Sequence, residues 1–241
     1  MYGYYFDPTY ILVIIGVLLC MAASSRVNST YHKYARVRAR SGMTGAEAAQ
    51  RILQMSGIHD VQIQHISGEL TDHYDPRSKV LRLSDAVYGS RSVAAIGVAA
   101  HECGHALQHK EGYLPLKLRS ALVPAANLGS KLGLPIVILG LILGIGLELP
   151  GGGYFSLAEI GVWIFALAVL FQIITLPVEF NASGRALKLL SSCGIMNEDE
   201  TDDCRRVLGA AALTYVAAAA SAILQLLRLL ILTGGRRRRD D

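Results

Sequence analysis

The sequence predicts a mostly α-helical membrane protein, with transmembrane helices and a small cytoplasmic α+β domain. Apolar residues make up 52% of the 241 residues and charged residues only 17%, and the mean hydropathy is +0.37. The apolar residues gather in four segments, as in proteins that cross a bilayer. A more polar stretch with helix-like and strand-like patterns separates the first segment from the second, and it is long enough to fold as a domain.

The four apolar segments are residues 10–23, 134–147, 160–178 and 210–232. The third is nearest to the length of about 20 residues that a spanning helix needs. No basic region precedes the first segment and no clear cleavage site follows it, so we interpret it as a retained anchor and not as a signal peptide. The second segment contains Gly140 and Gly144 in a G-x-x-x-G pattern, which predicts close helix packing in the membrane.

The positions of the Lys and Arg residues predict the orientation. The first ten residues carry none, whereas residues 26–40 carry five, so this flank is expected on the cytoplasmic side and the N-terminus outside. The second and third segments then form a hairpin whose connector, residues 150–153, lies outside. The basic stretch is also compatible with nucleic-acid binding, but the adjoining span favours lipid headgroups as its neighbours, with Tyr31 and Tyr34 as interface anchors. We therefore expect a multi-pass protein of the plasma membrane, in contact with the lipid bilayer and not with nucleic acid.

The fourth segment departs from this pattern, because a spanning helix there would carry the basic residues 236–239 to the outside. One interpretation is that its alanine-rich half packs on the cytoplasmic domain while its leucine-rich half, interrupted by Arg228, lies in the membrane interface or re-enters. The other is that the C-terminal charges are tolerated outside. The first is slightly favoured.

The polar stretch predicts a small α+β layer. Thr44 and Glu47 form a capping box before an amphipathic helix that ends at Gly57. Residues 61–66 alternate like a strand, and residues 70–74 and 80–83 flank a turn as a hairpin would. Ser92 is expected to cap the next helix. We divide the chain into an anchor (1–25), a cytoplasmic α+β part (26–131), a transmembrane hairpin (132–178) and a helical part ending in a membrane-associated helix (179–241).

The helix after Ser92 carries the most informative motif, the H-E-x-x-H string of residues 101–105. On a helix this spacing puts His101 and His105 on one face, one turn apart, where both can bind a single Zn²⁺. Glu102 lies on the flank of that face, from which a carboxylate can take a proton from a metal-bound water. Cys103 points away and is expected in the core, and Gly104 suggests that another backbone or a substrate approaches closely.

A catalytic zinc needs a third protein ligand and an open position. His109 shares the face but lies about 12 Å from His101 along a straight helix, too far for the same metal. Glu111 lacks the glycine-containing turn that would bring it back. Glu148 and Glu159 fall at the outer ends of the hairpin. Glu179 returns to the cytoplasmic mouth of the third span, so the topology singles it out, although a solvated glutamate would also fit that position.

The strings H-E-C-G-H-A-L-Q-H, L-P-V-E-F-N-A-S and A-A-L-T-Y-V-A resemble the YugP-like neutral zinc metallopeptidases, a bacterial membrane family, over nearly the whole chain. The architecture is similar to that of the HtpX-type proteases and CAAX prenyl endoproteases, gluzincins whose third ligand is a distant glutamate. The resemblance implies His101, His105 and Glu179 as ligands and Glu102 as base. It also implies a gluzincin-like domain. HtpX-type enzymes commonly have an Asp four residues after the ligand Glu, where this chain has Ser183.

Two functions compete at this stage. The first is an integral-membrane zinc endopeptidase acting on membrane or membrane-adjacent proteins, with His109 or Tyr215 stabilising the oxyanion. Its substrate would add as an extended strand to the sheet. The second is a non-catalytic zinc-binding membrane scaffold. Only the protease needs Glu102 as a free carboxylate, so the intact motif favours it. The sequence predicts neither the identity of the substrate nor the oligomeric state.

Overall fold

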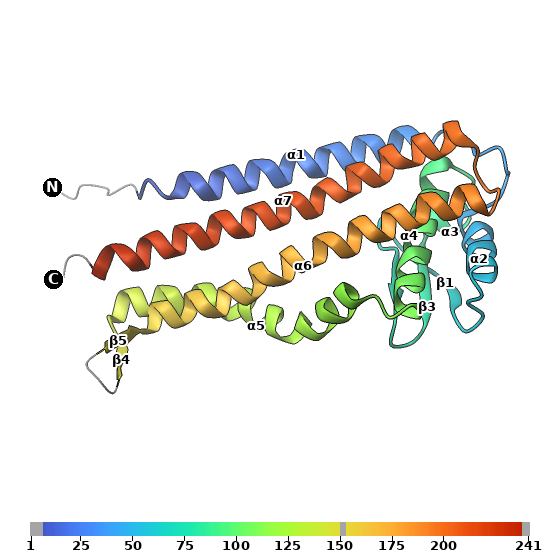
Figure 1. Cartoon of the computed structure of the whole chain (residues 1–241). Coiled ribbons are helices and arrows are strands. Elements are labelled where there is room, and N and C mark those ends of the chain that lie inside the picture. Colours follow the sequence, from blue (N-terminus) through green and yellow to red (C-terminus); the bar gives the residue numbers. More distant parts are fainter. Residues whose placement is uncertain (1–6, 150–152, 238–241) are drawn as a thin grey trace. The chain divides into compact units, whose positions relative to one another are not determined.

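The computed structural model describes residues 7–149 and 153–237 and is mostly helical, as the sequence predicts (Figure 1). The chain forms two compact units. The first comprises the described residues of 1–22, 118–175 and 215–241, and the second comprises residues 23–117 and 176–214. Both units share the four longest helices, which are α1 (Tyr10–Tyr34), α5 (Leu114–Leu143), α6 (Leu157–Ser192) and α7 (Glu198–Arg237).

Three of these helices contain the predicted apolar segments 10–23, 160–178 and 210–232 in full, whereas α5 contains only residues 134–143 of the segment 134–147. Each of the four helices is long and apolar enough to cross a membrane. In the first unit their outer surfaces are apolar. Trp163 is 68% exposed and Ile142 is 73% exposed, a degree of exposure that suits side chains in contact with lipid. The described part of the chain therefore has four helices whose length and apolar surface suit a membrane.

Helices α5 and α6 of the first unit pack through glycines. A Cβ added to Gly133 would lie 2.7 Å from the Cβ of Phe165, and one added to Gly140 would collide with the backbone of Ala158. The packing role predicted for Gly140 is thus found. The role predicted for Gly144 is wrong, because this residue has a φ of +62° and ends α5 in an open turn that only glycine adopts easily.

A short hairpin of β4 (Gly146–Leu149) and β5 (Gly153–Ser156) follows α5, where the sequence predicts only a loop. Residues 150–152 of the predicted outer connector lie outside the described residues, as does the side chain of Glu148.

Helix α7 runs from Glu198 to Arg237 without a break, so the re-entrant turn considered for its second half is absent from the described part of the chain. In the first unit α7 pairs antiparallel with the start of α1. Arg228 Nη2 lies 3.1 Å from Asp7 Oδ2 and its guanidinium covers the ring of Tyr10 at 4.0 Å. Further along the same two helices, Gly16 of α1 lies against Ser221 of α7. The arginine that interrupts the apolar segment is therefore paired.

The second unit contains the predicted α+β layer. Thr44 forms the expected capping box at the start of α2 (Gly45–Met55). Strands β1 (Gln62–Ile66), β2 (His73–Asp75) and β3 (Val80–Ser84) form a sheet in the order β1-β3-β2, in which β1 is parallel and β2 antiparallel to β3. The short α3 (Asp85–Tyr88) leads to α4 (Val93–Lys110), which Ser92 caps as predicted. Strand β2 is shorter than the predicted 70–74, and it forms one edge of the sheet.

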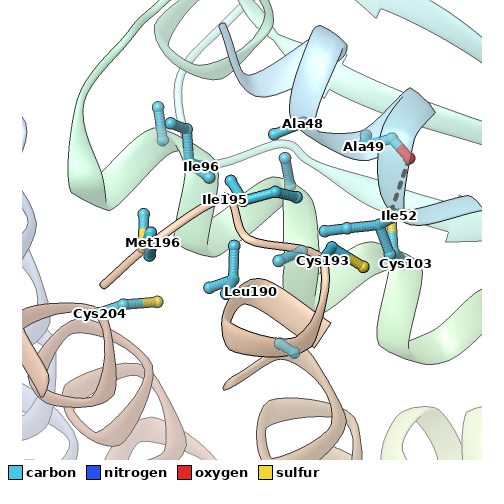
Figure 2. Close-up of a cluster of buried hydrophobic side chains, with 14 of the residues drawn as sticks. Ala48, Ala49, Ile52, Ile96, Cys103, Leu190, Cys193, Ile195, Met196 and Cys204 are labelled. Carbon is cyan, nitrogen blue, oxygen red and sulfur yellow. Dashed lines mark hydrogen bonds between the residues drawn. The ribbon is translucent and has the colours of Figure 1, made fainter. Parts of the chain in front are cut away.

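A buried cluster joins α2, α4, α6 and the turn after α6 (Figure 2). Ile52, Ile96 and Leu190 are at most 1% exposed. Cys103 lies in this cluster as predicted, and its thiol donates a weak hydrogen bond to the carbonyl of Ala49 at 3.7 Å. Burial of these side chains fixes the face of α4 opposite to the motif histidines.

Tyr31 and Tyr34 are buried, at 3% and 4% exposure, and not exposed as interface anchors. Their rings pack with Ala94 and Val207, and Arg206 Nη1 donates to the hydroxyl of Tyr34 at 3.1 Å. The anchor interpretation is wrong for both residues because α1 is covered here by α4 and α7 within the second unit.

Candidate metal centre

His101 and His105 lie next to each other on one face of α4. The Ser92 side chain accepts a hydrogen bond from the Ala95 backbone at 3.2 Å, which satisfies one of the free N–H groups at the start of this helix. The centroids of the two imidazole rings are 4.8 Å apart and the rings are nearly perpendicular, at 85°. The four-residue spacing therefore brings both rings to one point, as the motif predicts.

Glu179 reaches the same point from α6. Its Oε2 atom lies 3.2 Å from His101 Nε2 and 3.5 Å from His105 Nε2, and the residue is only 4% exposed. One atom of each side chain lies within 4.8 Å of the others, so the three residues form a group that could hold a metal ion.

The donor set fits zinc. Bonds of about 2.0–2.1 Å to a tetrahedral Zn²⁺ place neighbouring ligand atoms about 3.3–3.4 Å apart, close to the two separations between Glu179 and the histidines. Two imidazole nitrogens and one carboxylate oxygen are also the donors of catalytic zinc sites, in which a fourth position stays open for water. The chemistry and the spacing agree with the cofactor that the sequence predicts.

Gly104 allows α4 and α6 to approach. A Cβ on this residue would lie 2.5 Å from the carbonyl oxygen of Ala182, closer than real Cβ atoms come. The close approach predicted from Gly104 is thus found, and the neighbour is the backbone of the helix that carries Glu179. Gly97 likewise allows α4 to approach α7, because a Cβ on this residue would lie 2.5 Å from the Cys204 thiol.

Each histidine is oriented through its second ring nitrogen. His101 Nδ1 lies 3.1 Å from Ser183 Oγ, and His105 Nδ1 lies 3.0 Å from Gln108 Oε1. Both Nε2 atoms are thereby turned toward Glu179. Ser183, one of the residues predicted to surround the site, thus contacts a histidine of the group. Sequence reasoning missed Gln108, although its place three residues after His105 on the same helix face was a usable signal.

Glu102 lies beside the group without belonging to it. The residue is 8% exposed, and its Oε2 accepts a hydrogen bond of 2.9 Å from the backbone N–H of Tyr74 on β2. Glu102 is not one of the three grouped residues. The contact with the edge strand could not be read from the sequence, because the backbone N–H of any residue could make it.

His109 and Glu111 are not members of the three-residue group. His109 is exposed, is not part of the group, and its Nδ1 lies 2.8 Å from the Tyr74 hydroxyl. Glu111 forms an ion pair of 2.6 Å with Arg185. Tyr215, the other side chain predicted for the oxyanion, belongs to the first unit.

The charges of the group favour a cation. Burial, the largest single influence, lowers the pKa of His105, but its hydrogen bond to Glu179 and the negative charges of Glu102 and Glu179 outweigh burial and raise the pKa above its ordinary value of 6.5. An environment that stabilises the protonated imidazole also suits a metal ion in place of that proton.

Comparison with known proteins agrees with this geometry. The sequence profile of a family described as "Putative neutral zinc metallopeptidase" matches residues 9–234. The chain belongs to this family. It is also 47% identical over 205 residues to a protein of Bacillus subtilis (strain 168) named "Putative membrane protease YugP", a match that covers 85% of this chain and 87% of that protein. No solved structure matches the chain.

The zinc metallopeptidase profile spans both α4 and the part of α6 that carries Glu179, so the whole three-residue group lies inside the matched region. The name of the family agrees with the donor set, and the name of the relative agrees with four helices that are long and apolar enough for a membrane.

Proposed function

We propose that the chain is an integral-membrane zinc endopeptidase that hydrolyses peptide bonds of membrane or membrane-adjacent proteins. The observation that carries this proposal is the convergence of His101, His105 and Glu179 on one point, with the carboxylate of Glu102 next to them and outside the ligand group. A scaffold that only stores zinc has no use for this fourth group.

In this mechanism the three grouped residues would hold Zn²⁺, which when bound would activate water for attack and polarise the scissile carbonyl. Glu102 takes the proton of the attacking water and passes it to the leaving amine. The Tyr74 N–H holds one oxygen of Glu102, Oε2, and so leaves Oε1 to accept that proton.

We assign stabilisation of the oxyanion to His109, whose ring is hydrogen-bonded to the Tyr74 hydroxyl. Burial and the charges of Asp60 and Asp75 raise the pKa of the Tyr74 hydroxyl to about 12, so it keeps its proton at neutral pH. We assign this hydroxyl as the donor to His109 Nδ1, 2.8 Å away, an assignment that makes the Nε2–H of the His109 ring the donor for the developing negative charge.

The edge strand β2 is the proposed binding place for the substrate backbone. Among the described strands it pairs with β3 on one side only, and the Tyr74 N–H of β2 is bonded to Glu102. A peptide in extended form that adds along the other edge of β2 by main-chain hydrogen bonds would therefore lie next to the proposed base. A cavity of about 450 Å³ beside Tyr74 and His109, with Ala106 and Ile58 among its lining residues, would receive a substrate side chain. Recognition through the backbone favours cleavage inside a chain.

We further propose that the domain with the metal group faces the cytoplasm and that the four long helices cross the plasma membrane. Residues 26–40, in which the basic side chains gather, form the end of α1 and the segment after it, and they lie within the second unit, which also holds the metal group. This agrees with the excess of Lys and Arg on the cytoplasmic side of membrane proteins.

The test is Glu102→Gln in the purified full-length protein. We expect zinc content near that of the wild type and loss of casein cleavage by several orders of magnitude, since the amide cannot act as base. Glu69→Gln, at an exposed turn, is the matched control and should retain activity. Equal cleavage by wild type and Glu102→Gln would exclude the mechanism. Zinc binding by a wild type that cleaves nothing would favour the scaffold.

A further inference from the structure

Gln108 is a fully buried polar residue, 0% exposed, on the face of α4 next to the metal group. Its carboxamide makes three hydrogen bonds. Oε1 lies 3.0 Å from His105 Nδ1, and Nε2 donates to the carbonyl of Val178 at 2.8 Å and to Asn181 Oδ1 at 2.9 Å. Its partners are therefore a proposed ligand and two residues that flank Glu179 on α6.

The chemistry of these partners fixes the orientation of the amide. A backbone carbonyl can only accept, so the nitrogen of Gln108 must face Val178. Asn181 gives an independent check. Its Oδ1 also accepts a hydrogen bond of 2.7 Å from Arg185 Nε, and because arginine has no acceptor, this atom must be an oxygen. Both donors of Gln108 are thus used on α6, and its oxygen faces His105.

An oxygen facing His105 Nδ1 decides which ring nitrogen carries the hydrogen. Gln108 Oε1 can only accept, so Nδ1 donates and the neutral ring keeps its lone pair on Nε2. Nε2 is the atom 3.5 Å from Glu179 Oε2, on the metal side of the ring. The histidine is therefore held in the form that can bind a metal.

The same amide also fixes the third ligand. Val178 directly precedes Glu179, so its hydrogen bond to Gln108 ties the backbone at the carboxylate to α4. We propose that Gln108 is a positioning residue that sets both the tautomer of His105 and the distance between His105 and Glu179. The inference rests on the proposed metal site and adds the residue that assembles it.

Ser183 contrasts with Gln108. Its hydroxyl, 3.1 Å from His101 Nδ1, can donate or accept and so does not impose one tautomer. Ser183 is hydrogen-bonded to one ligand, whereas Gln108 is hydrogen-bonded to one ligand and also to the backbone next to another. Loss of the Ser183 hydroxyl should therefore weaken the site less than loss of the Gln108 amide.

The experiment measures the zinc dissociation constant of the detergent-solubilised full-length protein by competition with a chelator. Gln108→Met fills the space without polar atoms and should weaken zinc binding about 10–100-fold, with Ser183→Ala nearer the wild type. Gln108→Glu restores an acceptor for His105 and should recover part of the affinity. The visible spectrum of the Co²⁺-loaded protein should change in Gln108→Met, since it reports the arrangement of the ligands.

Leu190→Ala is the control for general destabilisation, because Leu190 is 0% exposed in the core of the same unit. It should lower the melting temperature and leave the zinc affinity of the folded protein unchanged. If Gln108→Met does not fold, Gln108→Asn carries the test, since its side chain is too short to reach both helices. If the folded variant binds zinc within about threefold of the wild-type affinity, the role of Gln108 is overturned but the metal site is not. A wild type that binds no zinc overturns the metal site as well.

Discussion

The backbone of Gly104 on α4 lies against the carbonyl oxygen of Ala182 on α6, three residues after the carboxylate of Glu179. A Cβ on Gly104 would come within 2.5 Å of that oxygen. The glycine inside the histidine motif thus sets the distance between the helix with the two histidines and the helix with the glutamate.

Replacement of Gly104 by Ala should therefore weaken the site. Alanine gains about 1 kcal/mol of helix propensity over glycine, but an extra methyl group against a backbone typically costs about 1–3 kcal/mol. The collision also pushes α6 away from His101 and His105. We expect a lower melting temperature and weaker zinc binding, measured by thermal unfolding with and without zinc.

Gly184→Ala is the matched control on α6. Nothing lies within 4 Å of a Cβ at this position, so the substitution should be neutral or stabilise the protein by up to about 1 kcal/mol. Zinc binding should stay as in the wild type. If Gly104→Ala behaves like Gly184→Ala in both measurements, close packing at Gly104 does not govern the site.

The sequence was sufficient for elements whose cause is local. The capping box at Thr44, the cap at Ser92 and the pair of histidines one turn apart depend on residues three or four positions away, and all are found. The four apolar segments could also be predicted, because length and composition alone identify a helix that could cross a membrane. Gly144 shows the limit, since a glycine that packs and a glycine that ends a helix look alike in a sequence.

Long-range contacts set the rest of the site. Glu179 was singled out by topology and by resemblance, and it lies 78 positions from His101. The Tyr74 N–H at Glu102 and the amide of Gln108 at Val178 depend on how a strand and two helices pack, which no local pattern encodes. The burial of Tyr31 and Tyr34 was missed for the same reason.

Glu179→Ala should lower bound zinc and abolish activity. Without this carboxylate the ion would be held by His101 and His105 alone, which is a weak site. Glu111→Ala is the control, because Glu111 pairs with Arg185 and is not part of the ligand group. Metal analysis of both purified variants should show less zinc in Glu179→Ala than in Glu111→Ala. Less zinc in Glu111→Ala would show that Glu111 and not Glu179 is the third ligand.

Stabilisation by zinc should increase with pH. The raised pKa of His105 means that the metal-free protein gains stability from the protonated ring below the ordinary pKa of 6.5, and loses this contribution as the pH rises through the raised value. Zinc needs the unprotonated ring, so its affinity rises over the same interval. The shift in melting temperature caused by zinc should be larger near about pH 8 than near about pH 6. A larger shift at the lower pH would contradict this coupling.

The last prediction concerns the two ends of the chain. The ion pair between Asp7 and Arg228 joins the start of α1 to the second half of α7, so the N-terminal end of α1 and the C-terminal end of α7 lie at the same end of the first unit. If α1 crosses the membrane with its N-terminus outside, a crossing α7 ends outside too, and the basic residues 236–239 are an exception to the positive-inside rule.

Cysteine labelling in intact cells tests this arrangement. In a Cys20→Ser background the remaining native thiols, Cys103, Cys193 and Cys204, are buried and should stay unlabelled. A membrane-impermeant maleimide should then label Gly152→Cys and Asp241→Cys, whereas Ser78→Cys, at the turn between β2 and β3, should react only after the cells are opened. Labelling of Ser78→Cys alone would invert the orientation. Labelling of Gly152→Cys with protection of Asp241→Cys would show that α7 does not cross the membrane, despite its length and its continuous helix.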